Sequence, residues 1–380
     1  MPGGLTQVIS VWQGKGRQFV ASLAVALTAV VGLSITPLEA RAAATTPTTS
    51  GCATDGYCYA GFSTVVTSGT WSIPANTNTI DVLTVGGGGG DTRGKCSYVW
   101  GQGGGGGGFA EALNQSVTPG ATANISVGAG GSGSGACNSA TLGTQGGTSS
   151  VLVDSVAIYA YGGYAPNSGT NYSTNVGGNS GNNSINGVSG SGTSGGAPTY
   201  DSTGNCTGAS LCGAGGGGGA AAAGSGMNAG TGKVSTLTAA RYSGGGGGRN
   251  NNSSGSADTN SGYSGRCDAP ANYGGGGADC NAQAVDRGGN GGSGYVYLRY
   301  LPGPTATIAN QTTGLGSTAT FTASPTKASN LTSATFAYQW QTSTDSGTTW
   351  SNISGATSAA YTTPTQNSTA TSAVRYRAKI

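Results

Sequence analysis

Four aspartates that lie close together in the sequence are the residues best suited to acid–base chemistry. They are Asp258, Asp268, Asp279 and Asp286. A glycoside hydrolase needs two neighbouring carboxyl groups, one to protonate the leaving group and one to attack or to activate water. Aspartate is also frequent in turns, because its side chain accepts hydrogen bonds from nearby backbone N–H groups. We interpret these four as turn residues. A cryptic carbohydrate-active enzyme that uses two of them is kept as the second alternative to the function predicted below.

Other catalytic arrangements lack their components. The chain contains no histidine, so a Ser–His or Cys–His nucleophile cannot be built. Beyond the first 42 residues the only glutamate is Glu111, which stands in a strand-like segment rather than beside a second acid. We therefore predict no catalytic residue and no enzymatic activity.

The N-terminal segment has the three parts of a secretory signal. Lys15 and Arg17 precede an apolar run over residues 19–35, and small residues surround Arg41. We predict export to the cell surface or extracellular space with cleavage after residue 42; an uncleaved membrane anchor is the alternative. Cleavage removes three basic residues and one acidic residue, so the formal charge falls from +3 to +1. A nearly neutral chain offers no patch for nucleic acid.

The eight cysteines predict disulfides, because their number is even and the chain is expected to be exported. Their spacing favours pairing between neighbours. The expected bonds are Cys52–Cys58, Cys96–Cys137, Cys206–Cys212 and Cys267–Cys280. A zinc cluster is the alternative, but there is neither a CxxC pair nor a histidine. No metal site is predicted.

Two glycine motifs that bind cofactors are matched only in part. A dinucleotide-binding turn begun at Gly86 fails at Asp91, and no helix follows. Calcium-binding nonapeptides are approached at residues 86–91 and 274–279, but both lack the apolar residue that the repeat requires. We predict no cofactor.

Glycine makes up 76 of 380 residues and is gathered into uninterrupted blocks. The five longest are residues 86–90, 103–108, 215–219, 244–248 and 274–277. Such blocks have no side chains to bury, so neither an amphipathic helix nor a half-buried strand can be read from them. They are either disordered or packed backbone against backbone. A charged content of only 7% argues against ordinary disorder.

The segments between these blocks have the alternation and β-branched residues of strands. We expect strands at 62–66, 70–74, 80–85, 109–117, 122–127, 148–160 and 294–300, with a turn at Ser68-Gly69. They predict one β-sandwich into which the glycine blocks are inserted. Ala220–Ala223 is too short to form a helix alone.

Residues 61–300 resemble the secreted glycine-rich domain of bacteria and phages. The matching pieces are residues 68–74, 82–85, 117–120, 125–131, 146–150 and 292–300. The resemblance implies a β-sandwich that carries packed polyglycine II helices, as in phage tail-tip adhesins and receptor ectodomains of the anaplastic lymphoma kinase type. In those proteins the loops that join the helices meet a partner. A polyglycine II helix has no internal hydrogen bonds, so neighbouring helices must satisfy its peptide groups.

Residues 303–380 resemble bacterial immunoglobulin-like repeats, through residues 338–341, 343–350 and 353–357. The resemblance makes Trp340 the core tryptophan and Tyr376 the corner tyrosine. Strands are expected at 317–323, 335–341, 350–353, 359–363 and 373–380, with a turn at 345–347. Because the chain stops where a last strand is expected, we predict an incomplete domain.

The expected organisation is therefore all-β and has four parts. Residues 1–42 form the signal peptide, and residues 43–60 form a Thr/Pro spacer with the Cys52–Cys58 loop. Residues 61–300 form the glycine-rich domain, a β-sandwich with inserted polyglycine II helices. Residues 303–380 form the immunoglobulin-like β-sandwich, after a hinge at 301–304.

Tyrosine and tryptophan stand near the ends of the glycine blocks, among serine, glycine and asparagine. This is the composition of binding loops, in which rigid amphipathic rings supply contact area. The candidate ligand-binding residues are Tyr98, Trp100, Tyr164, Tyr172, Tyr200, Tyr242, Tyr263 and Tyr273. The alternative is that these rings pack over the block ends as local core.

The sequence thus predicts a secreted or cell-surface adhesion or recognition protein that is not an enzyme. Its loops would be presented on a rigid glycine-rich scaffold toward glycans or another cell-surface partner, and not toward nucleic acid. A purely structural component of an extracellular matrix or envelope is the first alternative.

Overall fold

A computed structural model describes residues 43–92, 101–135, 142–166, 177–197, 214–248, 256–262, 267–278, 287–303, 305–308, 311, 316–326, 335–365 and 374–380. The expected signal peptide, residues 1–42, lies outside these ranges. All regular elements of the described residues are β-strands, so the all-β prediction is confirmed.

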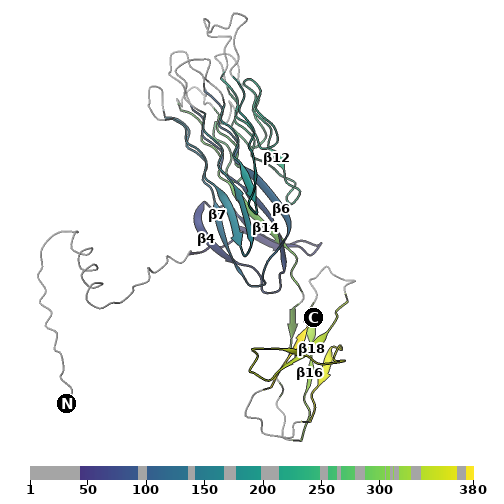
Figure 1. Cartoon of the computed structure of the whole chain (residues 1–380). Helices are drawn as coiled ribbons and strands as arrows, with labels where there is room; N and C mark the ends of the chain where they lie inside the picture. Colours follow the sequence, from purple (N-terminus) through teal and green to yellow (C-terminus); the bar gives the residue numbers. More distant parts are fainter. Residues whose placement is uncertain are drawn as a thin grey trace, which may run out of the picture. The chain divides into compact units, whose positions relative to one another are not determined.

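Two sheets form the strand half of the glycine-rich domain (Figure 1). The five-stranded sheet contains, in spatial order, β2 (Thr49–Cys52), β3 (Cys58–Phe62), β14 (Tyr295–Tyr300), β5 (Thr79–Val85) and β6 (Phe109–Ser116). The seven-stranded sheet contains β1 (Ala43–Ala44), β4 (Val66–Ser72), β7 (Thr122–Val127), β8 (Ser149–Val153), β9 (Val156–Ala160), β10 (Asn183–Ile185) and β11 (Val188–Gly190). A separate pair joins β12 (Lys233–Val234) to β13 (Arg241–Tyr242). Apart from the parallel β1–β4 pair, these pairings are antiparallel.

The main hydrophobic core lies between the two sheets. Val82 and Leu298 of the five-stranded sheet belong to the same buried cluster as Ile125, Val151 and Ile158 of the seven-stranded sheet. All five side chains are fully buried. The two sheets therefore pack face to face as a sandwich, as the alternation of the strands predicted.

Strand β5 lies between β14 and β6, and both of its faces are buried because each face packs on a hydrophobic cluster. Ile80 and Val82 point into the main core, whereas Leu83 and Val85 contribute to a second cluster with Phe109 and Tyr242. Its near-continuous apolar sequence fits this central position.

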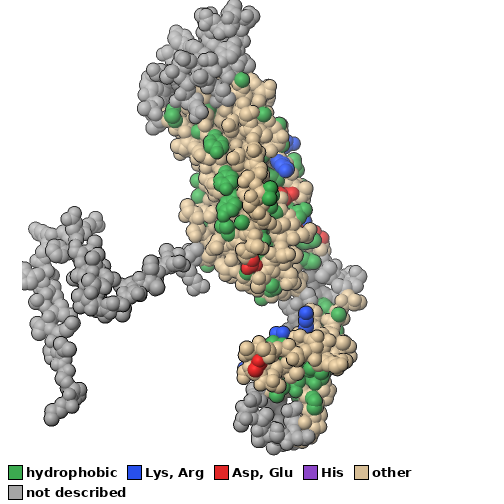
Figure 2. All heavy atoms as spheres, viewed as in Figure 1, with side chains coloured by type: hydrophobic (Ala, Val, Ile, Leu, Met, Phe, Trp, Pro, Cys, Tyr) green, Lys and Arg blue, Asp and Glu red, His purple; other side chains and the backbone are tan. Residues whose placement is uncertain are grey.

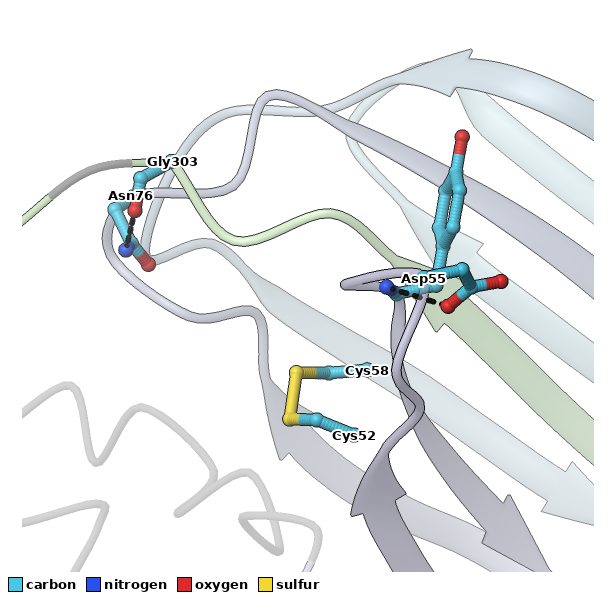
Figure 3. The surroundings of a disulfide bond; sticks show 6 residues. Cys52, Asp55, Cys58, Asn76 and Gly303 are labelled. Atoms are coloured by element: carbon cyan, nitrogen blue, oxygen red, sulfur yellow. Dashed lines mark hydrogen bonds between the residues drawn. A yellow bond between two sulfur atoms is a disulfide. The ribbon is translucent and has the colours of Figure 1, made fainter. Parts of the chain in front are cut away.

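The N-terminal spacer prediction differs from the structure, which places residues 43–62 in both sheets. Strands β2 and β3 form a hairpin in which Cys52 and Cys58 are direct cross-strand partners, and their disulfide is confirmed. Figure 3 shows this disulfide beside Asp55, whose carboxylate accepts a bond from the Tyr57 N–H in the turn. Main-chain pairing with β3 can thus hold a segment whose own side chains are small and mostly exposed.

The predicted turn at Ser68-Gly69 is wrong, because both residues lie inside β4. Gly69 pairs with Ile125 of β7 next to a register shift that begins at Val66. A Cβ atom at Gly69 would come within 1.8 Å of the Thr45 hydroxyl oxygen. Glycine here marks a β-bulge and a close approach rather than a turn.

The single strand predicted at 148–160 is a hairpin of β8 and β9. The chain reverses at Asp154, which has a φ of 50°. The Asp154 carboxylate also accepts a hydrogen bond of 2.6 Å from the Thr118 N–H. Aspartate tolerates the left-handed conformation better than most residues, which explains the turn.

The glycine blocks are polyglycine II helices, and their hydrogen bonds repeat every three residues. In the helix at 86–91, successive N–H groups donate to carbonyl groups of three neighbouring segments in turn. Residues 86 and 89 donate to residues 108 and 105, and residues 87 and 90 donate to residues 147 and 144. Residues 88 and 91 donate to residues 292 and 289. Every bond runs sideways to another segment of the chain. The prediction of packed polyglycine II helices is confirmed.

We call the hydrogen-bonded set of glycine helices the glycine lattice. The helix at 103–108 lies inside it. It donates hydrogen bonds to residues 215–218, 274–277 and 161–164, and accepts them from 178–181, 86–89 and Gly246. A Cβ atom on Gly105 would lie 1.9 Å from the carbonyl oxygen of Asn179, and one on Gly104 would lie 2.2 Å from that of Gly89. Only glycine allows neighbouring backbones to approach this closely.

The C-terminal region forms three small antiparallel sheets. These are β15 (Thr305–Thr307) with β17 (Ser324–Thr326), β16 (Thr320–Thr322) with β20 (Ala360–Thr362), and β19 (Ser351–Asn352), β18 (Gln339–Ser343) and β21 (Arg375–Lys379) in that order. Trp340 is fully buried and packs near Phe321 and Tyr361, as expected of a core tryptophan. Tyr376 packs between the same two rings. Gly347, with a φ of 95°, completes the predicted turn.

Candidate functional site: the outer glycine layer

Five glycine-containing segments continue five neighbouring strands of the seven-stranded sheet and keep their order. They follow or precede β7, β8, β9, β10 and β11, and are residues 128–134, 143–148, 161–166, 177–182 and 191–196. Hydrogen bonds between adjacent members confirm the order: 147 to 129, 146 to 163, 164 to 179, and 180 to 193. We call this set the outer glycine layer.

Each segment of the outer glycine layer exposes side chains three residues apart. These are Ala129 and Ser132, Gln145 and Thr148, Tyr161 and Tyr164, Asn179 and Asn182, and Ser191 and Ser194. The spacing follows from the three residues per turn of polyglycine II, because every third Cα faces the same side. The residues between them are mostly glycines that face the lattice. The strand order thus arranges the exposed side chains in a regular array.

Tyr164 is the predicted ligand-binding residue that the structure places on this array. It is 42% exposed, and Tyr161, one turn before it, is 40% exposed. Tyr161 is nearly parallel to Tyr159 of β9, with ring centroids 6.1 Å apart and an interplanar angle of 13°. The row of three rings therefore extends from the sheet onto the lattice.

Two other predicted residues, Tyr242 and Tyr273, pack against each other over the five-stranded sheet. Their ring centroids are 5.7 Å apart, and Tyr242 also stacks on Tyr295 at 6.2 Å. Tyr242 is only 4% exposed, and its burial raises the pKa of its hydroxyl to about 12. The geometry of Tyr242 is that of a core side chain, which is the alternative given above for rings beside glycine blocks.

The remaining predicted ligand-binding residues lie outside the described residues. They are Tyr98, Trp100, Tyr172, Tyr200 and Tyr263. The predicted pairs Cys96–Cys137 and Cys206–Cys212 also lie outside. Cys267 is disulfide-bonded, but its predicted partner Cys280 falls outside the described ranges.

The aspartates considered for catalysis have structural partners where they are described. Asp268 forms a bidentate ion pair with Arg287, at 2.6 and 2.8 Å, and accepts a bond from the Asn290 N–H. The Arg287 guanidinium lowers the pKa of Asp268, which favours its ionised form. Asp258 lies 3.7 Å from Arg241 and accepts bonds from the N–H groups of Gly232 and Thr259. Asp279 and Asp286 lie outside the described residues.

The outer glycine layer contains no charged residue in its five segments. Figure 2 shows few charged side chains over the visible face of the glycine-rich domain, where hydrophobic side chains stand among polar atoms. The exposed array offers hydroxyls, carboxamides and tyrosine rings. It is therefore suited to hydrogen bonding and stacking, and not to ion pairing.

The sequence reasoning missed this array because it considered only uninterrupted glycine blocks. A usable signal is present in triplets of the form Gly-Gly-x, in which x recurs three residues later. Gly162-Gly163-Tyr164 follows Tyr161, and Gly291-Gly292-Ser293 follows Asn290. Such triplets indicate a helix at the lattice edge, where one of its three sides faces away from other backbones.

A family model described as a glycine-rich domain matches residues 63–301. The match covers more than half of the chain, so the chain belongs to the glycine-rich domain family. A second model, described as a domain of unknown function, matches residues 305–380. The boundary between the two matches falls in the predicted hinge. No curated protein matches the chain.

The part of the chain that the structure describes contains no apolar helix of the length needed to span a membrane. In the same part of the chain, no group of three or more cysteine, aspartate or glutamate side chains could hold a metal ion.

Proposed function

We propose that this protein is a secreted or cell-surface recognition protein without catalytic activity, which presents binding residues on a rigid glycine lattice. The observation that carries this proposal is the lateral bonding of the lattice. The helix at 103–108 exchanges hydrogen bonds with six neighbouring segments, so its backbone has no freedom to move independently. A rigid support lowers the entropy lost when a partner binds.

The path of the chain supports a role for the loops. Residues 86–91 leave the end of β5, and residues 103–108 return to the start of β6. At the end away from the strands, Thr92 and Gln102 form an antiparallel bridge, so the two helices are still paired on either side of residues 93–100. The sequence between them includes Tyr98 and Trp100, and we propose that these rings take part in binding the partner.

The proposed partner is a glycan or another cell-surface molecule. Tyrosine and tryptophan rings present both an apolar face and a polar edge, which suits sugar rings. The near neutrality expected of the exported chain disfavours partners that depend on charge.

Binding to a glycan array and to intact cells tests the proposal, with Trp100→Ala and Tyr200→Ala as variants. We expect saturable binding that weakens in at least one variant. Saturable binding unchanged in both would remove these two loop residues from the site. No binding to any glycan or surface would contradict recognition and favour the structural matrix role. Polysaccharide hydrolysis lost on Asp→Asn substitution would contradict the absence of catalysis.

A further inference from the structure

The exposed array of the outer glycine layer has a regular three-residue spacing, and three of its features point to one kind of ligand. The first is the pair of tyrosines. Tyr161 and Tyr164 lie three residues apart on one polyglycine II helix, which separates their Cα atoms by about 9 Å along the helix axis. The rings are two-fifths exposed. Tyr159, nearly parallel to Tyr161, lengthens the row.

The second feature is the fixed backbone beneath these rings. The Tyr161 N–H donates to the Asn182 carbonyl at 3.0 Å, and the Tyr164 N–H donates to the Asn179 carbonyl at 2.9 Å. Gly162 and Gly163 between them are buried. The backbone positions that carry the rings are thus set before any ligand arrives, and binding orders little more than the side-chain torsions.

The third feature is the row of carboxamides on both sides of the tyrosines. Asn179 and Asn182 use their side-chain oxygens to accept bonds from the N–H groups of Gly195 and Gly192, at 3.1 and 2.8 Å. Their NH2 groups therefore remain as donors at the surface. On the other side, Gln145 donates from Nε2 to the Gly162 carbonyl at 3.2 Å, which leaves its carboxamide oxygen as an acceptor.

We propose that this array binds an extended, uncharged polysaccharide chain, with two successive disaccharide units stacked on Tyr161 and Tyr164 and with Tyr159 beside Tyr161 as a further contact. The tyrosine spacing is close to the length of a disaccharide, and the flanking carboxamides can bond to sugar hydroxyls. The five segments contain no charged residue. An acidic polymer would therefore bury its carboxylates without a cationic partner on this surface, whereas a neutral polymer has no charge to compensate. This inference rests on the proposed recognition function and assigns it a site on the side of the lattice.

A second copy of the chain could cover the same flat array, and the test separates this from polysaccharide binding. Residues 43–380 are incubated with insoluble cellulose and chitin, and with soluble polygalacturonate as the acidic comparison. The variants are Tyr161→Ala/Tyr164→Ala, Tyr161→Phe/Tyr164→Phe and the control Val234→Ala, an exposed apolar side chain on β12. Sedimentation velocity gives the oligomeric state of each variant.

We expect binding to at least one neutral polymer and not to polygalacturonate. The double alanine variant should weaken it at least about tenfold, because two ring-stacking contacts are lost. The double phenylalanine variant should retain most of the binding, and Val234→Ala should retain all of it. Circular dichroism and unfolding of each variant show whether the fold is kept.

Three results would overturn the inference. Undiminished binding by a folded double alanine variant would remove the array as the site. Binding lost in Trp100→Ala/Tyr200→Ala but not in the double alanine variant would keep the proposed recognition function and move its site to the loops. A dimer of the parent chain that becomes monomeric in the double alanine variant, without polymer binding by either, would assign the array to self-association.

Discussion

The two halves of the glycine-rich domain are built on opposite principles. In the strand half, side chains such as Val82 and Leu298 fill the space between two sheets, and burial of apolar surface provides the stability. In the lattice half, the interior consists mainly of glycine backbone, and peptide groups of neighbouring helices bond directly to one another. The strand half is sensitive to the removal of atoms, whereas the lattice half is sensitive to their addition.

This contrast teaches why the lattice must grow from the sheets. A glycine helix gains no hydrophobic stabilisation and loses more backbone entropy than other residues on folding. Each outer segment, however, continues a strand that is already placed by its side chains. The sheets thus align the helices in order, and the lateral hydrogen bonds complete the lattice.

The addition of one methyl group to the lattice interior should have the largest effect. In Gly105→Ala the new Cβ would lie 1.9 Å from the Asn179 carbonyl oxygen and 2.4 Å from its carbon. Both are backbone atoms held by further hydrogen bonds, so neither can move alone. We expect a loss of at least about 4 kcal/mol in the free energy of unfolding, measured by urea denaturation. A change below about 1 kcal/mol would show that the lattice is loosely packed.

The removal of atoms from the strand half should have the next largest effect. Leu298→Ala empties space in the core between the sheets, where the native side chain is fully buried. We expect a loss of about 3 kcal/mol in the same experiment. A loss below about 1 kcal/mol for Leu298→Ala would contradict the account of the strand half as a core of packed side chains.

Alkaline pH should weaken the second core cluster, at the junction of sheet and lattice. Burial raises the pKa of Tyr242 to about 12, against about 10 in an unfolded chain. The folded state then holds its proton more tightly, so the stabilisation is complete below about pH 10 and is lost as the pH rises toward 12, by up to about 2 kcal/mol. Burial also raises the pKa of Tyr295.

Ultraviolet titration of the tyrosinates, run together with thermal unfolding at each pH, measures this effect. Tyr242→Phe is the matched control, since it keeps the ring and removes the ionisable hydroxyl. We expect the variant to lose less stability between pH 10 and pH 12. The same loss in both proteins would exclude Tyr242 as the source.

The smallest effect is expected at the lattice edge. Ser132→Gln changes an exposed side chain whose Cα already carries a Cβ facing solvent, so unfolding should change by less than about 0.5 kcal/mol. At its neighbour, Gly131→Ala would bring a Cβ within 2.0 Å of the Thr144 carbonyl oxygen. Urea denaturation of the two variants compares their free energies of unfolding, and the difference tests whether only every third residue faces solvent. A similar cost at both positions would contradict it.

Strands with strong patterns were predictable from the sequence. The range predicted for β7 is identical to the observed one, and β5 and β14 differ by one residue. These strands place apolar side chains in the sandwich core, and this requirement produces the alternating or continuous apolar pattern in the sequence. The predictions failed where other contacts decide: β4 contains Gly69 because Thr45 approaches it closely, and β2 is held by pairing with β3.

The site was less predictable than the fold. The composition of the surrounding sequence was enough to select Tyr164 as a candidate. It did not predict that Tyr164 is aligned with Tyr161, Asn179 and Asn182. That alignment depends on which glycine segments are neighbours in space, which the order of β8, β9 and β10 decides. Tyr242 was predicted as a loop residue because a glycine block follows it, yet its ring packs on Phe109 and Tyr295.

Hydrogen exchange at single residues tests the central claim most directly, because the lattice depends on amide bonds alone. The N–H groups of Gly104, Gly105, Gly106 and Gly107 each donate to a carbonyl of another segment, at 2.7–3.0 Å. We predict that they exchange as slowly as the amides of β5 in the sandwich core. Exchange at the rate of an unstructured peptide, while β5 stays protected, would show that the glycine segments do not form a bonded lattice.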